Sequence, residues 1–189
     1  HTLSSNEIYG KTLGLVGFGR IGIRIAEIAK VFNMDICAFD RSPEKPHKKS
    51  AAEKMCVKFT DIETLFKTSD IISIQTPLNA ETRNLVDTKI IASMKKTAMI
   101  INVGRGKIIN EDALYEALRD GQIAGAALDV FSEEPPKDNP LLNLRNFVGT
   151  PHVGAQTMQA QKKIGDDVLA IVDGFEHGKD LNDLGGVVV

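Results

Sequence analysis

Short apolar runs alternate with helical patterns along most of the chain. Strands are expected at residues 12–16, 35–39, 71–75, 98–103, 123–128 and 147–149. Helices are expected at residues 20–32, 62–67, 87–94, 111–119 and 155–176, and a polar loop at 41–50. Strands and helices that take turns imply a parallel sheet with helices on both faces. The pattern therefore predicts an α/β fold, a Rossmann-type doubly wound parallel sheet.

A glycine-rich turn lies between the first predicted strand and helix, with the sequence Gly17-Phe18-Gly19-Arg20-Ile21-Gly22. The first glycine permits a tight turn, and the second lets the backbone approach a pyrophosphate. The third allows close packing, while the helix N-terminus offers N–H groups to an anion. Glycines also occur in turns that bind nothing, so this motif alone is weak evidence for a dinucleotide site.

Asp40 ends the second predicted strand, where an acidic side chain is placed to accept hydrogen bonds from an adenosine ribose. The alternative is an ordinary turn residue at a strand end. A carboxylate here repels a 2′-phosphate, so NAD is favoured over NADP, although Arg41 beside it softens that preference. The basic run at 45–49 is expected to be a solvated loop, because charge runs usually face water.

Three later segments place chemically apt residues just beyond predicted strands, where ligands collect in such sheets. Arg105 lies between two glycines that leave it room to present its guanidinium to a carboxylate. Glu134 lies in the segment 128–136, and His152 precedes the long helix, a place suited to an acid/base imidazole. Taken singly, Arg105 also fits a surface turn and His152 a polar cap.

The four motifs together resemble the D-isomer-specific 2-hydroxyacid dehydrogenase family. Their order, GFGRIG, then NVGRG, then LDVFSEEPP, then TPHVGAQT, looks most like that of the D-3-phosphoglycerate dehydrogenases. The resemblance implies hydride transfer between NAD(H) and a D-2-hydroxy acid or 2-oxo acid. It further implies 3-phosphoglycerate as the substrate, and the oxidation of this compound is the first step of serine biosynthesis.

The resemblance also implies roles for individual residues. Arg105 would bind the carboxylate and carbonyl of the substrate, and His152 would be the acid/base. Glu134, which directly precedes the proline, would orient His152 and raise its pKa. No metal site is expected. The implied cofactor contacts are Gly17, Gly19, Arg20, Ile21, Gly22, Asp40, Thr76, Pro77, Val103 and Asp129, although Thr76 and Pro77 also fit a simple turn after a strand.

Composition excludes several classes of partner. The formal net charge is −2 with both signs mixed along the chain, so neither nucleic acid nor a membrane surface is an expected partner. No apolar run approaches the roughly 20 residues of a membrane span. Cys37 and Cys56 build no disulfide framework, which favours a soluble protein in the reduced cytoplasm. By resemblance, the long helix and the region 120–144 are expected to form a homodimer.

We expect three segments: a linker remnant at 1–10, an NAD-binding Rossmann domain at 11–178 and a C-terminal tail at 179–189. Members of the resembled family have a second domain that closes over the nucleotide domain. That domain is largely missing here, so we expect a fragment that binds NAD but is nearly inactive.

Three alternatives stay open. One is a glyoxylate or hydroxypyruvate reductase of the same family, and another is a non-catalytic, corepressor-like protein that senses NADH. A methyltransferase also begins from a glycine-rich turn, but it gives no role to Arg105 and His152.

Overall fold

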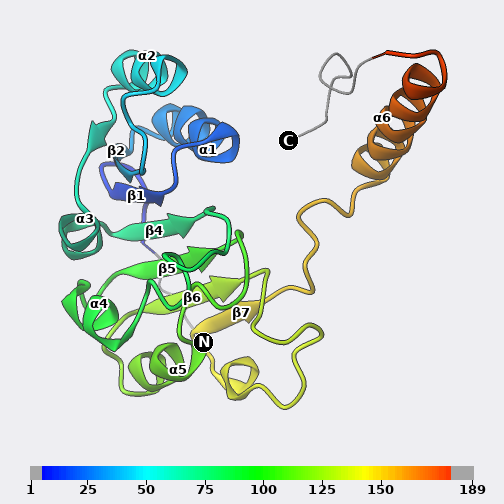
Figure 1. The fold of residues 1–189 in the computed structure, drawn as a ribbon. Helices are drawn as coiled ribbons and strands as arrows, with labels where there is room; N and C mark the ends of the chain where they lie inside the picture. Colours follow the sequence, from blue (N-terminus) through cyan, green and yellow to red (C-terminus); the bar gives the residue numbers. More distant parts are fainter. Residues whose placement is uncertain (1–5, 180–189) are drawn as a thin grey trace. The chain divides into compact units, whose positions relative to one another are not determined.

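The computed structural model describes residues 6–179 and divides the chain into two units, residues 1–151 and residues 152–189. The first unit holds the sheet, and the second holds one long helix (Figure 1). Residues 1–5 of the predicted linker remnant at 1–10, and all but the first residue of the predicted tail at 179–189, lie outside the described residues. Their boundaries therefore stay predictions.

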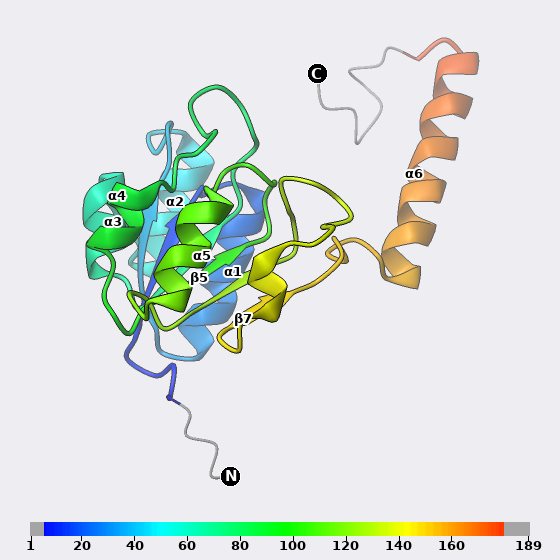
Figure 2. The same ribbon diagram turned by 90° about the horizontal axis from the view of Figure 1, so that it is seen from below.

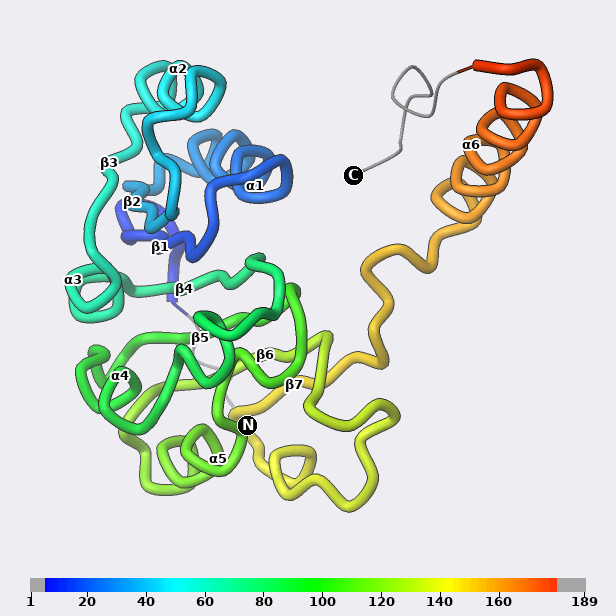
Figure 3. The backbone as a smooth tube through the Cα atoms, viewed as in Figure 1, coloured from blue at the N-terminus to red at the C-terminus, as the bar shows by residue number. Residues whose placement is uncertain are grey.

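The sheet has seven parallel strands in the order β3-β2-β1-β4-β5-β6-β7. Because the order reverses between β1 and β4, the loops after these strands part and leave a crevice at the carboxyl edge. The loops after β4, β5 and β6 turn back at this same edge (Figure 3). The bounds are β1 Thr12–Val16, β2 Asp35–Phe39, β3 Lys58–Phe59, β4 Ile71–Ile74, β5 Met99–Asn102, β6 Gly125–Leu128 and β7 Phe147–Gly149.

The helices form two groups on opposite faces of the sheet. Each group packs against the sheet through its own apolar core. One core includes α1 and α2, and the other includes α3, α4 and α5. In the second group α3 and α4 lie side by side (Figure 2). This arrangement confirms the predicted doubly wound α/β fold. The bounds are α1 Arg20–Val31, α2 Pro46–Met55, α3 Ile62–Thr68, α4 Thr88–Ser93, α5 Glu111–Arg119, the short 3₁₀ helix η1 Pro140–Asn143 and, in the second unit, α6 Met158–Glu176.

The central strand β1 contributes to both cores by alternation, as a buried strand must. Leu13 and Leu15 pack with α1 and α2, while Val16 packs with α3. Gly14 points toward α3, and a Cβ at this position would lie 2.7 Å from the Leu65 Cδ2 atom and closer still to the Ser69 hydroxyl. The absence of a side chain at Gly14 therefore sets how closely α3 approaches the sheet.

Helix α1 buries a different face from the one that its large apolar residues suggested. Its buried residues are Gly22, Ala26 and Ala29, whereas Ile28 is 61% and Phe32 52% exposed. Phe32 therefore lies outside the core. Helix α1 begins directly after a tight turn on the sheet, and only small side chains fit between the helix and the strands at that distance.

Helix α2 and strand β3 were not predicted, and the expected loop at 41–50 becomes helical at Pro46. Only Ala52 and Met55 of α2 are buried, so the helix shows little apolar periodicity. Pro46 at the first turn was the available signal, because proline is favoured at the start of a helix. Residues 46–49 of the basic run are consequently the start of a helix rather than a loop, and Lys45 is its N-cap residue.

The long helix α6 exposes apolar side chains within its own unit, among them Ile164 at 49%, Val168 at 52% and Val172 at 50%. Across residues 6–179, no helix combines the length and the apolar character that crossing a bilayer demands.

We predict that Gly14→Ala destabilises the protein. The added methyl group overlaps Leu65 and Ser69, and overpacking of this kind typically costs about 1–3 kcal/mol. Urea unfolding followed by circular dichroism measures the change. Val148→Ala at the 62% exposed position in β7 is the control, with an expected change of about 0.5 kcal/mol or less. Equal unfolding midpoints for the two variants would contradict the packing role of Gly14.

Candidate functional site

The turn after β1 is held by backbone contacts that require glycine. Gly17 has a φ of +100°, and its N–H donates to the Phe39 carbonyl oxygen at 2.8 Å. A Cβ on Gly22 would overlap the Gly17 carbonyl oxygen, so the first turn of α1 folds directly onto the loop. These contacts supply the physical reason for the first and third glycines of the motif.

The middle glycine of the turn faces open space. A Cβ on Gly19 would meet no atom within 4 Å, and Gly19 precedes α1 without a capping side chain. Backbone N–H groups at an uncapped helix start can bind an anion. The turn therefore fits a pyrophosphate, with Arg20 and Ile21 exposed at the start of the helix.

Asp40 lies across from this turn with its side chain only 10% exposed. One carboxylate oxygen, Oδ2, accepts from the Phe18 N–H at 2.9 Å. The other, Oδ1, accepts from the Ser42 N–H at 2.8 Å and from the Lys48 ammonium at 2.6 Å. Asp40 thus joins the glycine turn, the loop after β2 and helix α2.

These contacts decide the charge of Asp40. Burial by itself raises the pKa of the carboxyl group, but the hydrogen bonds from Lys48, Ser42 and Phe18 outweigh it. The net effect is a pKa below the usual range of aspartate. Asp40 is therefore ionised at neutral pH.

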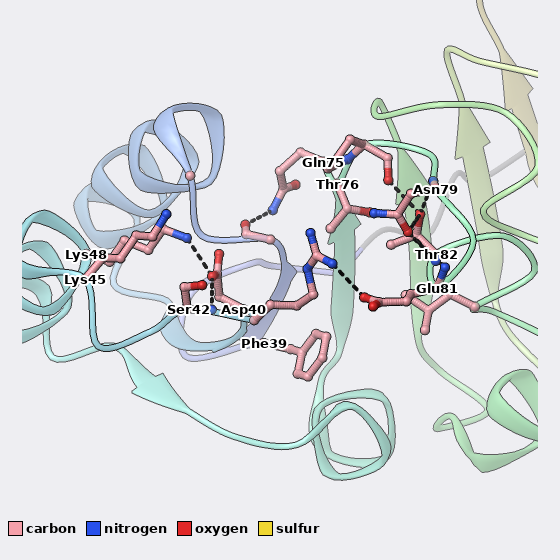
Figure 4. A pocket seen from close by; sticks show the side chains of 15 residues that line it. Phe39, Asp40, Ser42, Lys45, Lys48, Gln75, Thr76, Asn79, Glu81 and Thr82 are labelled. Carbon is pink, nitrogen blue, oxygen red and sulfur yellow. Dashed lines mark hydrogen bonds and ion pairs between the residues drawn. The ribbon is translucent and has the colours of Figure 1, made fainter. Parts of the chain in front are cut away.

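A pocket of about 330 Å³ opens between the glycine turn, the loop after β2 and the loop after β4. Figure 4 shows Asp40 on one side of it and the Thr76 segment on the other. The pocket brings together several predicted cofactor contacts, namely Gly17, Gly19, Asp40, Thr76 and Pro77. Its other lining residues include Arg41, Ser42, Lys45, Lys48, Gln75, Asn79, Glu81 and Thr82.

The loop after β4 is rigidly held and presents a polar atom. Gln75 donates from Nε2 to the Gly17 carbonyl oxygen at 2.7 Å, which ties β4 to the glycine turn. The Thr82 hydroxyl donates to the Pro77 carbonyl oxygen at 2.7 Å. Thr76 Oγ1 is buried without a hydrogen-bond partner among the described residues. A buried hydroxyl of this kind is suited to a ligand, because leaving it unsatisfied is costly.

The loop that carries Arg105 is built on Asn102, which is 2% exposed. Asn102 Oδ1 accepts from the Gly104 N–H at 3.0 Å, and Asn102 Nδ2 donates to the Arg105 carbonyl oxygen at 2.9 Å. Arg105 is exposed, and its Nη1 donates to the Gly104 carbonyl oxygen at 2.8 Å. Val103, another predicted cofactor contact, is 40% exposed beside it.

Gly104 and Gly106 allow neighbouring loops to pack closely. The sequence-based interpretation, that these glycines leave room for the Arg105 side chain, is corrected accordingly. A Cβ on Gly104 would lie 2.8 Å from the Thr76 carbonyl oxygen. A Cβ on Gly106 would overlap the Phe131 carbonyl oxygen. The Arg105 loop is therefore wedged between the loops after β4 and β6.

Glu134 and Asp129 lie in the loops beyond β6. The Phe131 N–H donates to Glu134 Oε1 at 3.0 Å, so Phe131 contacts Glu134 through its N–H and Gly106 through its carbonyl oxygen. Asp129 is 9% exposed and accepts from the Thr150 hydroxyl at 2.6 Å. The structure thus links the Arg105 loop and Glu134 through one residue.

His152 begins the second unit of the chain and has a left-handed backbone with φ of +54°. Its convergence with Arg105 and Glu134 stays a prediction. Within residues 6–179 the structure contains no cluster of histidine, cysteine and carboxylate side chains suited to a metal ion.

The lining residues that sequence reasoning missed include Lys48, Ser42 and Gln75. Ser42 acts through its backbone N–H, so its side chain gave no signal. Lys48 belongs to a basic run that gave no specific signal. Recognising a helix start at Pro46 was the available route to its contact with Asp40. Gln75 was named as the end of a strand, without a role.

A family model described as D-isomer specific 2-hydroxyacid dehydrogenase, NAD binding domain, matches residues 1–154. D-3-phosphoglycerate dehydrogenase of Methanocaldococcus jannaschii is 52% identical over 160 residues, covering 84% of this chain and 30% of that protein. Hydroxypyruvate reductase of Thermotoga maritima is 44% identical over 170 residues, covering 88% of this chain and 53% of that protein. The chain thus spans about a third to a half of these relatives.

The fold is also similar to that of a solved D-lactate dehydrogenase with NAD⁺ from Lactobacillus jensenii. The TM-score is 0.87 at 31% identity, and the alignment covers 98% of this chain and 58% of that one.

We predict that Asp40→Asn lowers stability in a pH-dependent way. An asparagine keeps one acceptor oxygen and turns an N–H₂ group toward a donor, so contacts with Lys48, Ser42 or Phe18 are lost. Because the folded pKa of Asp40 is lowered, its contribution is fully present above the unfolded value of about 3.9. That contribution is lost as the pH falls through the folded pKa.

Urea unfolding over a pH series tests this expectation. The difference in unfolding free energy between wild type and Asp40→Asn should be constant near neutral pH and shrink in acid. Asp35→Asn, at the exposed start of β2, is the control with little expected change at neutral pH. A difference that grows with acidification would contradict the assignment.

Proposed function

This chain belongs to the D-isomer specific 2-hydroxyacid dehydrogenases, and from that membership we propose that the protein transfers a hydride between NAD(H) and a D-2-hydroxy acid or 2-oxo acid. The observation that carries the proposal is the packing of the Arg105 loop between the Thr76 and Phe131 loops. This packing brings the backbone of the Arg105 loop against Thr76, which lines the pocket, and against Phe131, whose N–H contacts Glu134.

The chain is an NAD-binding domain, and its residues fit that cofactor. The uncapped start of α1 fits the pyrophosphate, Asp40 fits the adenosine ribose, and the buried Thr76 hydroxyl offers a further polar contact. When bound, the nicotinamide ring supplies or accepts the hydride. Positioning that ring at the carboxyl edge of β5 and β6 is the task proposed for Val103 and Asp129.

Arg105 is proposed to bind the carboxylate of the substrate. A guanidinium forms two parallel hydrogen bonds to a carboxylate, which fixes the carbonyl group in one orientation. Its loop is held by both ends of the Asn102 amide, so the backbone beneath the guanidinium is preorganised. Fixing one face of the carbonyl group toward the hydride determines the D stereochemistry.

His152 is proposed to exchange the proton that accompanies hydride transfer. In reduction, the oxygen of the 2-oxo group gains negative charge and takes a proton from the imidazolium, and in oxidation the hydroxyl returns it. Glu134 is proposed to orient the imidazole and favour its charged form. Its contact with the Phe131 N–H supports this role, because that hydrogen bond fixes one of the two carboxylate oxygens.

We propose 3-phosphoglycerate as the substrate, supported by the 52% identity to a D-3-phosphoglycerate dehydrogenase. The 44% identity to a hydroxypyruvate reductase supports the second candidate, a glyoxylate or hydroxypyruvate reductase. An NADH-sensing binding protein with negligible turnover is the third. Homodimerisation of the whole protein stays a prediction that sedimentation tests.

A substrate panel on the whole protein distinguishes these candidates. We expect kcat/KM for hydroxypyruvate phosphate to exceed that for hydroxypyruvate and glyoxylate by tenfold or more, on the order of the discrimination that a polar group contributes. The 189-residue chain alone is expected to bind NADH with little turnover. Equal use of glyoxylate would favour the reductase, and NADH-dependent assembly without turnover would favour the sensor.

Arg105→Lys tests the substrate clamp. Lysine keeps the charge but loses the planar pair of donors, so kcat/KM should fall about a hundredfold while the Kd of NADH is unchanged. Steady-state kinetics and NADH fluorescence provide the two measurements. Arg145→Lys, two residues before β7 at the opposite edge of the sheet, is the matched control. Unchanged kcat/KM in Arg105→Lys would overturn the proposed role.

A further inference from the structure

The partly buried ion pair between Asp40 and Lys48 is a feature of the pocket that the proposed function does not explain. The Lys48 side chain is 13% exposed and the Asp40 side chain 10%, and their charged atoms lie 2.6 Å apart. Figure 4 shows the lysine reaching Asp40 from helix α2. Lys48 therefore donates a hydrogen bond to the carboxylate that is expected to bind the ribose of a dinucleotide.

The acceptor positions of Asp40 are nearly all in use. A carboxylate has about four lone-pair positions, two on each oxygen. Oδ1 already accepts from Ser42 and Lys48, and Oδ2 accepts from Phe18. One position remains, whereas the adenosine ribose of NAD offers two hydroxyl groups. The advantage that an aspartate gives to an unphosphorylated ribose is thereby reduced.

The charge of the pocket also differs from what Asp40 alone suggests. Its ionisable lining residues are two carboxylates, Asp40 and Glu81, and three cations, Arg41, Lys45 and Lys48, which leaves a net charge of +1. Glu81 pairs with Arg41 at 2.6 Å and Asp40 pairs with Lys48, while Lys45 has no ion-pair partner within residues 6–179. An anion entering this pocket meets a weakly positive surface.

We propose that Lys48 is a specificity-determining residue that allows the pocket to accept a phosphate group on the 2′ carbon of the adenosine ribose, so that NADPH binds as well as NADH. The inference rests on the proposed function, because it places that ribose beside Asp40. Lys48 cancels the negative charge of Asp40 and keeps two unused N–H donors. Lys45 and Arg41 add donors from the same loop and helix start.

The test compares the Kd values of NADH and NADPH for the 189-residue chain by fluorescence titration. Lys48→Met removes the charge but keeps a long side chain, and Lys48→Arg keeps the charge. Lys49→Met is the matched control, because Lys49 is exposed in the same helix and does not line the pocket. Thermal unfolding of each variant shows whether it is folded.

In the wild type, NADPH should bind within about tenfold of NADH, a difference of about 1.4 kcal/mol or less. Lys48→Met should weaken NADPH relative to NADH by on the order of tenfold, because Asp40 then repels the phosphate. Lys48→Arg and Lys49→Met should leave that ratio unchanged. In the wild type, added salt should weaken the binding of NADPH more than the binding of NADH. This difference in salt dependence should be smaller in Lys48→Met.

A wild-type preference for NADH of about a hundredfold or more would overturn the inference and leave the proposed function intact. An unchanged ratio in folded Lys48→Met would overturn it as well. If Lys48→Met does not fold, the wild-type ratio and its salt dependence decide the question. Failure of both dinucleotides to bind the wild type would count instead against the proposed function.

Discussion

Close backbone packing at the carboxyl edge of the sheet is the constraint on which the site depends. Gly22 packs on the Gly17 carbonyl, Gly104 on the Thr76 backbone and Gly106 on the Phe131 carbonyl. Any side chain at these positions would push neighbouring loops apart, since protein interiors leave little free volume. The glycines therefore let loops from β1, β4, β5 and β6 share one small region.

That packing explains how loops distant in sequence come to lie together in the first unit. Asn102 shapes the Arg105 loop from within, and Phe131 contacts both Gly106 and Glu134. A guanidinium and a carboxylate are thus carried by loops that support each other, which limits how far either can move. Such preorganisation is where a dehydrogenase gains rate, because orientation of the substrate carbonyl lowers the entropic part of the barrier.

Charge interactions dominate around Asp40, whereas close backbone packing holds the Arg105 loop. Asp40 is ionised, partly buried and bound by donors from three segments, so it acts as a structural junction beside its proposed role in binding the ribose. Of these donors only Lys48 carries a charge, so its replacement would alter both local stability and the net charge around Asp40. One carboxylate therefore carries both a structural role in the fold and the proposed contact with the cofactor.

Local patterns in the sequence determined the alternation of strands and helices apart from α2 and β3, the glycine turn, the place of Asp40 directly after β2, and the family with its NAD cofactor. These features depend on neighbours a few residues apart. Tertiary structure alone decided that α1 buries Gly22, Ala26 and Ala29, that Lys48 reaches Asp40, and that Gly106 packs against Phe131. Such contacts depend on how closely separate segments approach, a distance that periodicity and composition along one chain do not encode.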